Sequence, residues 1–208
     1  MGVKIKICGL TRQVDMDYLL SCPPDFAGFV FWKKSRRYVD FDRAQVLSSY
    51  LRDKQEGAEK KIRTVGVFVD EERDLILRLA GAGVIDLIQL HGNETKEDIA
   101  FYKRETGLPV IKAVRVEKGT ETDEWMDSEA DFLLLDSGMG SGRSFNWKGF
   151  AGKIEKPFFL AGGIGPDNMK EAVDIFKPYA LDMSSSLESG GYKDMEKIKA
   201  VMELAGSL

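Results

Sequence analysis

The 208-residue sequence has few of the residues that build metal sites and disulfide frameworks. It contains two cysteines, Cys8 and Cys22, and a single histidine, His91. These are too few for a zinc site of their own, and they make no disulfide pattern. An excess of basic residues is also missing, because 30 Lys and Arg face 34 Asp and Glu, for a net charge of −4. This balance argues against a protein that binds nucleic acid through a basic face.

Long hydrophobic runs are absent as well. The longest apolar stretch, Phe26 to Trp32, is far shorter than the roughly 20 residues that cross a membrane. Near the start, lysines alternate with valine and isoleucine, so we expect no secretory signal and predict a cytoplasmic location with reduced thiols. With 43% hydrophobic and 31% charged residues, the composition is typical of a soluble globule, and the length predicts a single domain over residues 1–208.

Short β-branched or apolar segments recur along the chain, and amphipathic segments separate them. Strands that alternate with helices form a parallel sheet, because each right-handed crossover returns the next strand in the same direction. Eight such units predict an α/β fold, a single-domain (β/α)₈ or TIM barrel, rather than an open sheet. The predicted strands are Lys4–Cys8, Phe26–Phe31, Thr64–Val69, Leu87–His91, Val110–Val116, Asp131–Asp136, Pro157–Ala161 and Ala180–Ser184.

Three of the segments between strands carry clear helix signals. These are a capping aspartate, a Thr-x-x-Asp capping box and a proline suited to a first helical turn. The connections at 117–130 and 147–153 are weak as helices. The signals and their predicted helices are Asp70 before Glu71–Ala82, Thr95 with Asp98 for Glu97–Arg104, and Pro166 before Asp167–Phe176.

Two reactive side chains stand at predicted strand ends, where (β/α)₈ barrels place their chemistry. Cys8 ends the first strand, and we expect nearby cations or a helix N-terminus to lower the pKa of its thiol. Asp136 ends the sixth strand after an apolar run, where burial would raise its pKa toward that of a proton donor. Both residues also have an alternative interpretation that is purely structural. Cys8 is equally a small buried hydrophobe, and Asp136 equally a cap for the turn that follows.

A buried ion pair is predicted beneath Cys8. Side chains alternate across a strand, so Lys6 shares the inward face with Cys8 and needs a partner there. Closing the barrel brings the eighth strand beside the first. Asp182 stands on that strand, and we therefore predict an ion pair between Lys6 and Asp182.

Small and polar residues at the seventh and eighth strand ends predict a phosphate site, since backbone N–H groups and a helix N-terminus favour a phosphate dianion. The glycine-rich segment 138–142 favours a lid over a dinucleotide turn. Arg37 is either a clamp for a carboxylate or an ordinary solvated arginine. For His91 we favour a hydrogen-bonding role over catalysis. The phosphate candidates are Gly162, Gly163, Ser184, Ser185 and Ser186.

Several short motifs occur in one order over nearly the whole chain. Together they give the sequence a resemblance to the phosphoribosylanthranilate isomerase family of tryptophan biosynthesis. The motifs are Lys6 to Thr11, Gly28 to Phe31 with Ser35 to Val39, Val65 to Phe68, Gln89 to Gly92, Leu134 to Ser137, Gly140 to Gly142 with Phe145 to Trp147, Leu160 to Gly163, and Asp182 to Ser185 with Glu188, Lys193 and Asp194.

The resemblance implies an Amadori rearrangement of N-(5-phosphoribosyl)anthranilate to 1-(2-carboxyphenylamino)-1-deoxyribulose 5-phosphate, with no cofactor and no metal. It implies Cys8 as general base and Asp136 as general acid. It also implies that Arg37 faces the anthranilate carboxylate, and that Asp182 and His91 lie on the substrate side. The expected partner is this phosphosugar, with no nucleic acid and no membrane, for a monomer or a homodimer.

Two positions depart from the family pattern. Arg36 stands where the family usually has proline, which would loosen the clamp. Ser186 replaces a glycine that would permit a positive φ and a close approach of the backbone to phosphate.

Two other functions are open to a barrel of this kind. One is an indoleglycerol-phosphate synthase, a lyase that needs lysine and glutamate groups the strand ends do not offer. The other is a ligand-binding barrel without catalysis, which would need neither Cys8 nor Asp136.

Overall fold

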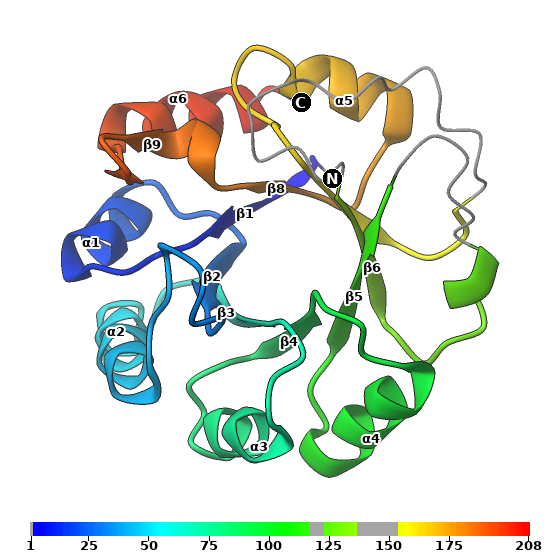
Figure 1. Cartoon of the computed structure of the whole chain (residues 1–208). Coiled ribbons are helices and arrows are strands. Elements are labelled where there is room, and N and C mark those ends of the chain that lie inside the picture. The colour runs from blue at the N-terminus through cyan, green and yellow to red at the C-terminus, as the bar shows by residue number, and fades with distance from the viewer. Residues whose placement is uncertain (1, 117–122, 137–153) are drawn as a thin grey trace.

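Eight parallel strands close into a barrel in the order of the chain, as Figure 1 shows for the computed structural model. The structure describes residues 2–116, 123–136 and 154–208. Strand β1 pairs with β8, which closes the barrel and sets Lys6 opposite Asp182. The predicted (β/α)₈ barrel is confirmed. The strands are β1 (Lys4–Cys8), β2 (Phe26–Val30), β3 (Arg63–Phe68), β4 (Leu87–Leu90), β5 (Val110–Arg115), β6 (Phe132–Asp136), β7 (Phe158–Ala161) and β8 (Ala180–Met183).

Helices cover the outside of the barrel (Figure 1). Short elements fill two further connections: a 3₁₀ turn at Asp123–Trp125 follows β5, and a 3₁₀ turn at Ser185–Leu187 follows β8. A small antiparallel ribbon of β9 (Glu188–Ser189) and β10 (Tyr192–Lys193) comes next. No helix of the described ranges is long and apolar enough to cross a bilayer. The helices are α1 (Gln13–Ser21), α2 (Phe41–Lys54), α3 (Arg73–Gly81), α4 (Lys96–Thr106), α5 (Met169–Phe176) and α6 (Met195–Ala205).

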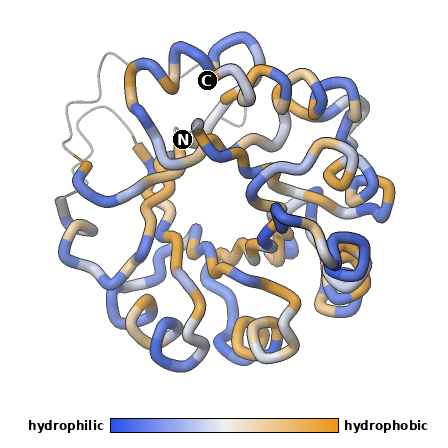
Figure 2. Tube along the Cα trace, turned by 180° about the vertical axis from the view of Figure 1, so that it is seen from behind, coloured by the Kyte–Doolittle hydropathy of each residue, from blue (hydrophilic) through white to orange (hydrophobic). Residues whose placement is uncertain are grey.

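Apolar side chains form two buried clusters, one inside the barrel and one between the strands and the helices. Figure 2 shows the hydrophobic colour gathered on the strands and the hydrophilic colour on the outer turns of the helices. The inner cluster is contributed by side chains at alternate strand positions, because neighbouring residues of a strand point to opposite faces. These side chains fill the interior of the barrel. Its buried members are Phe26, Val65, Leu87, Ile111, Leu134, Phe159, Ala161 and Ala180.

One predicted helix signal is confirmed, and two are wrong. Thr95 and Asp98 form the capping box at the start of α4, and Gly107 ends that helix in the left-handed region. Asp70 caps nothing: its backbone is left-handed, with φ 49°, and its carboxylate accepts hydrogen bonds from Asn93.

Pro166 also lies outside the helix it was predicted to open. Helix α5 begins at Met169, three residues later than Pro166, with Asn168 as its N-cap. The predicted lid at 138–142 and the weak connection at 147–153 lie outside the described residues. A single domain over residues 1–208 stays a prediction.

Candidate active site

A cavity of about 430 Å³ opens at the C-terminal ends of the strands. This volume is within the range of pockets that bind small molecules. Apolar side chains, among them Val30 and Trp32, form part of the wall. All the site residues proposed from the sequence line this one cavity: Cys8, Arg37, His91, Asp136, Gly162, Gly163, Asp182, Ser184, Ser185 and Ser186.

A buried ion pair lies at the floor of the cavity, as predicted. Lys6 Nζ is 3.0 Å from both carboxylate oxygens of Asp182, and the Lys6 side chain is fully buried. Burial disfavours the charge of Lys6. The Asp182 carboxylate and the Cys8 sulfur favour it more strongly, so the pKa of Lys6 is raised. The floor therefore carries a lysine that stays charged at neutral pH.

Cys8 is packed against the backbone of the neighbouring strand. A Cβ added to Gly28 would lie 2.9 Å from Cys8 Sγ, so glycine is required there for the thiol to fit. Burial raises the pKa of the Cys8 thiol, although Lys6 and Lys193 act in the opposite direction. The expected lowering of this pKa is wrong, because the loss of hydration outweighs the two nearby cations.

Asp136 at the end of β6 is joined to β4 through a short chain of side chains. His91 Nε2 lies 3.2 Å from Asp136 Oδ2, and Gln89 Nε2 lies 2.9 Å from His91 Nδ1. With the Gln89 amide in this orientation its nitrogen can only donate, which assigns His91 Nδ1 as the acceptor and places the ring proton on Nε2. His91 thus donates to Asp136 on the cavity wall.

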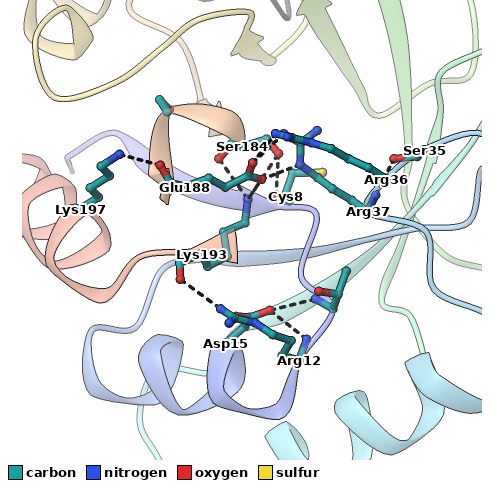
Figure 3. Close-up of polar contacts among 12 residues, drawn as sticks. Cys8, Arg12, Asp15, Ser35, Arg36, Arg37, Ser184, Glu188, Lys193 and Lys197 are labelled. Atoms are coloured by element: carbon teal, nitrogen blue, oxygen red, sulfur yellow. Dashed lines mark hydrogen bonds and ion pairs between the residues drawn. The ribbon is translucent and has the colours of Figure 1, made fainter. Parts of the chain in front are cut away.

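Arg37 is held by a protein carboxylate, as Figure 3 shows. Its Nε donates to Glu188 Oε1 at 2.6 Å and its Nη2 to Oε2 at 3.0 Å. Arg36 donates to the same carboxylate at 2.6 Å, so the arginine in place of the family's proline adds a cation at this point. Lys193 Nζ donates to Glu188 Oε1 at 2.9 Å and to the carbonyl of Ser184 at 3.0 Å. Burial would raise the pKa of Glu188, but Arg37 and Lys193 outweigh it, so that pKa is lowered.

The two segments proposed for phosphate binding directly follow β7 and β8, and they lie next to each other. Gly162 and Gly163 have φ of 92° and 71°, a conformation that favours glycine. Ser186 Oγ donates to the Ile164 carbonyl at 2.5 Å, which joins the two segments. Ser186 is absent from the residues with positive φ, so the serine fits where the family has glycine.

Comparison with known proteins decides the family. The family model described as N-(5′-phosphoribosyl)anthranilate isomerase matches residues 5–204. The chain belongs to this family. A relative of that name from Endomicrobium trichonymphae is 40% identical over 210 residues, with 99% of each chain covered. Another from Thermoanaerobacter pseudethanolicus is 38% identical over 207 residues, with 97% of each covered.

Solved structures of the isomerase have the same fold. The enzyme from Thermus thermophilus superposes with a TM-score of 0.82 at 33% identity, with 99% of both chains covered. A second, in complex with reduced 1-(o-carboxyphenylamino)-1-deoxyribulose 5-phosphate, has a TM-score of 0.77 at 30% identity and covers 99% of this chain and 100% of its own. The chain described above is accordingly an isomerase, and its reaction is the isomerisation step of tryptophan biosynthesis.

The structure adds residues of the isomerase that the sequence reasoning passed over. Gln89, Glu188 and Lys193 were noted only as parts of motifs, without a role. Their signal was weak, because Glu188 and Lys193 lie in the short ribbon after β8, where no periodic pattern marks a buried position. Within the described ranges, no three His, Cys, Asp or Glu side chains are grouped as a metal site.

Proposed function

We propose that the isomerase uses Cys8 as general base and Asp136 as general acid in the Amadori rearrangement of N-(5-phosphoribosyl)anthranilate. The observation that carries this assignment is that both side chains line one cavity, together with the two segments proposed for the phosphate. A ligand-binding barrel without catalysis would need neither group. A lyase that forms indoleglycerol phosphate would need lysine and glutamate at the strand ends, and the described residues that line this cavity include neither.

Opening of the furanose ring is the first step. Asp136 gives its proton to the ring oxygen while the bond from that oxygen to C1′ breaks. The nitrogen lone pair forms the C1′=N double bond at the same time, so the product is a protonated imine. His91 donates to the other side of the Asp136 carboxyl group, at Oδ2, which stabilises the carboxylate that remains.

Removal of the C2′ proton is the second step, and we assign it to the Cys8 thiolate. The C–H electrons move into the C1′–C2′ bond, and the imine π electrons return to nitrogen. Because the protonated imine accepts these electrons, the step needs no cofactor. The enolamine that results becomes the aminoketose when C1′ takes up a proton and the C2′ hydroxyl loses one, which balances the protons exchanged with Cys8 and Asp136. The raised pKa of Cys8 makes its thiolate scarce at rest. Lys6 and Lys193 reduce this cost, because both favour the anion.

Substrate binding is assigned to the cavity walls. The phosphate would be held by Gly162 and Gly163 and by the serines after β8 (Ser184, Ser185 and Ser186), where backbone N–H groups suit a dianion. The anthranilate carboxylate would face Arg37 Nη1, because Nε and Nη2 are bound to Glu188. Asp182 and His91 would face the sugar, with Trp32 beside the aromatic ring.

The test is loss of anthranilate-type fluorescence when pure protein meets freshly made substrate. Cys8→Ser and Asp136→Asn should each lower kcat by at least about 10²-fold, since one general acid or base step carries that much. Cys22→Ser is the matched control and should keep wild-type turnover, because Cys22 is the other free cysteine and is not in the cavity.

Binding of inorganic phosphate separates loss of chemistry from loss of fold. Both catalytic variants should bind phosphate as wild type does. If the wild type binds phosphate without turnover, the isomerase assignment fails; near-wild-type rates in both variants would overturn the two catalytic roles.

We place the isomerase in the cytoplasm with reduced thiols, acting on a phosphosugar and not on nucleic acid. Either a monomer or a homodimer is compatible with the cavity lying within one chain.

A further inference from the structure

Gln89 presents a buried hydrogen-bond acceptor that has no partner among the described residues. Its Oε1 is buried and accepts no hydrogen bond from the described residues, while its Nε2 is bound to His91 Nδ1 at 2.9 Å. Gln89 lies on β4 in the inward register of Leu87, and it lines the active-site cavity. An unsatisfied buried polar atom destabilises the fold, so a position that keeps one calls for an explanation.

The two ends of the Gln89 amide are linked by its chemistry. When Nε2 donates to His91, Oε1 is the atom left for another donor, and turning the amide over would exchange these roles. A donor from the ligand at Oε1 would therefore hold Nε2 toward His91. This in turn requires His91 to carry its proton on Nε2, the nitrogen that faces Asp136.

We propose that Gln89 is a positioning residue, whose Oε1 accepts a hydrogen bond from a sugar hydroxyl and whose Nε2 thereby locks the tautomer of His91. The donors then run in one direction: substrate O–H to Gln89, Gln89 to His91, and His91 to Asp136 Oδ2. His91 thereby donates to one Asp136 oxygen, Oδ2, in the state in which Asp136 acts as the acid. This proposal rests on the acid role of Asp136, but the state of His91 is measured independently of turnover.

The chain has one histidine, which makes the experiment unambiguous. In protein labelled with ¹⁵N-histidine, the two ring-nitrogen shifts tell which nitrogen carries the proton. Spectra are recorded at pH 8, where an ordinary histidine is neutral. The probes are reduced 1-(o-carboxyphenylamino)-1-deoxyribulose 5-phosphate, which has sugar hydroxyls, and inorganic phosphate, which has none of them.

In wild type with the reduced phosphosugar, the proton should be on Nε2. Phosphate alone should leave a less complete Nε2 population. A ring with its proton on Nδ1 in the phosphosugar complex would overturn the proposal, and so would an equal response to the two probes. These wild-type spectra decide the matter even where a variant fails to fold.

Gln89→Glu reverses the direction of the hydrogen bond to His91, because a carboxylate only accepts and would draw the ring proton to His91 Nδ1. We expect that variant to show the altered ring shifts and a kcat lowered at least about tenfold. Gln55→Glu is the control at the other buried glutamine, which bonds to Ile62 away from the cavity, and its His91 shifts should match wild type.

Gln89→Glu with wild-type kcat and wild-type shifts would refute the role. If the ring shifts change as expected while Asp136→Asn remains fully active, Asp136 is not the general acid. The role of Gln89 in fixing the His91 tautomer is then still supported.

Discussion

Removing one member of the Lys6–Asp182 pair should destabilise the protein by several kcal/mol. At 3.0 Å the attraction of the two charges is about 5.5 kcal/mol for an effective dielectric constant of about 20. Asp182→Leu leaves a fully buried ammonium group without its partner, a change that typically costs about 3–5 kcal/mol. Lys6 can escape by losing its proton. From its ordinary pKa of 10.5, deprotonation costs about 4.8 kcal/mol at pH 7. The loss of stability in Asp182→Leu therefore cannot greatly exceed this value.

Urea denaturation and thermal unfolding measure this loss apart from activity. For a domain of this size, 3–5 kcal/mol is a fall of about 6–20 °C in Tm. The double variant Lys6→Met/Asp182→Leu should recover most of the loss, since no charge is left buried. The control is Asp127→Asn at the exposed pair with Lys96, where the change should stay below about 1 kcal/mol.

The pH dependence has a definite sign. In wild type the pKa of Lys6 is raised, because Asp182 and Cys8 overcome its burial. The contribution of the pair is therefore complete below pH 10.5 and is lost as the pH rises through the folded-state pKa. In Asp182→Leu the buried, unpaired Lys6 has a lowered pKa, so the variant gains stability as the pH rises toward 10.5.

The difference in free energy of unfolding between wild type and Asp182→Leu, here called the stability gap, should thus narrow between pH 7 and 10.5. The reasoning is refuted if the gap stays constant over that range, if Asp182→Leu is no less stable than the surface control, or if the double variant is as unstable as the single one.

Three further predictions concern the site and the helices. Gly9→Ala should raise KM at least about tenfold with a smaller effect on kcat, because Gly9 has φ 81° and an added Cβ would overlap Arg37 Cδ; an unchanged KM contradicts this. Glu188→Gln should lower the free energy of unfolding at pH 7, and this deficit should close as the pH falls through the lowered pKa of Glu188; a pH-independent deficit contradicts it. Thr95→Ala should cost about 1 kcal/mol in denaturant unfolding through loss of the α4 cap, and should leave kcat unchanged.

The barrel was predictable because its signals are local and repeat along the chain. Buried strands are continuous apolar runs, so all eight predicted strands agree with the structure to within one residue at each end. The Lys6–Asp182 pair was predictable for the same reason: alternation turns both inward, and closure of β8 on β1 sets them opposite each other.

Features that depend on distant contacts escaped the sequence reasoning. Asp is a residue type that often caps helices, yet the Asp70 carboxylate accepts hydrogen bonds from Asn93 in the loop after β4. Arg37 is held by Glu188, 151 positions away, and no periodic pattern links the two. The sequence indicated a cation near Cys8, but it could not indicate how fully the thiol is buried.

The order of residues alone is therefore enough to specify a closed barrel, the edge at which its chemistry lies and the side chains gathered there. Periodicity records which face of each segment is buried, and strand ends follow from it. The proton state of Cys8, the partner of Arg37 and the unpaired acceptor of Gln89 follow from the folded chain. They depend on burial and on distances of a few ångströms between residues far apart in sequence, and these exist only once the barrel has closed.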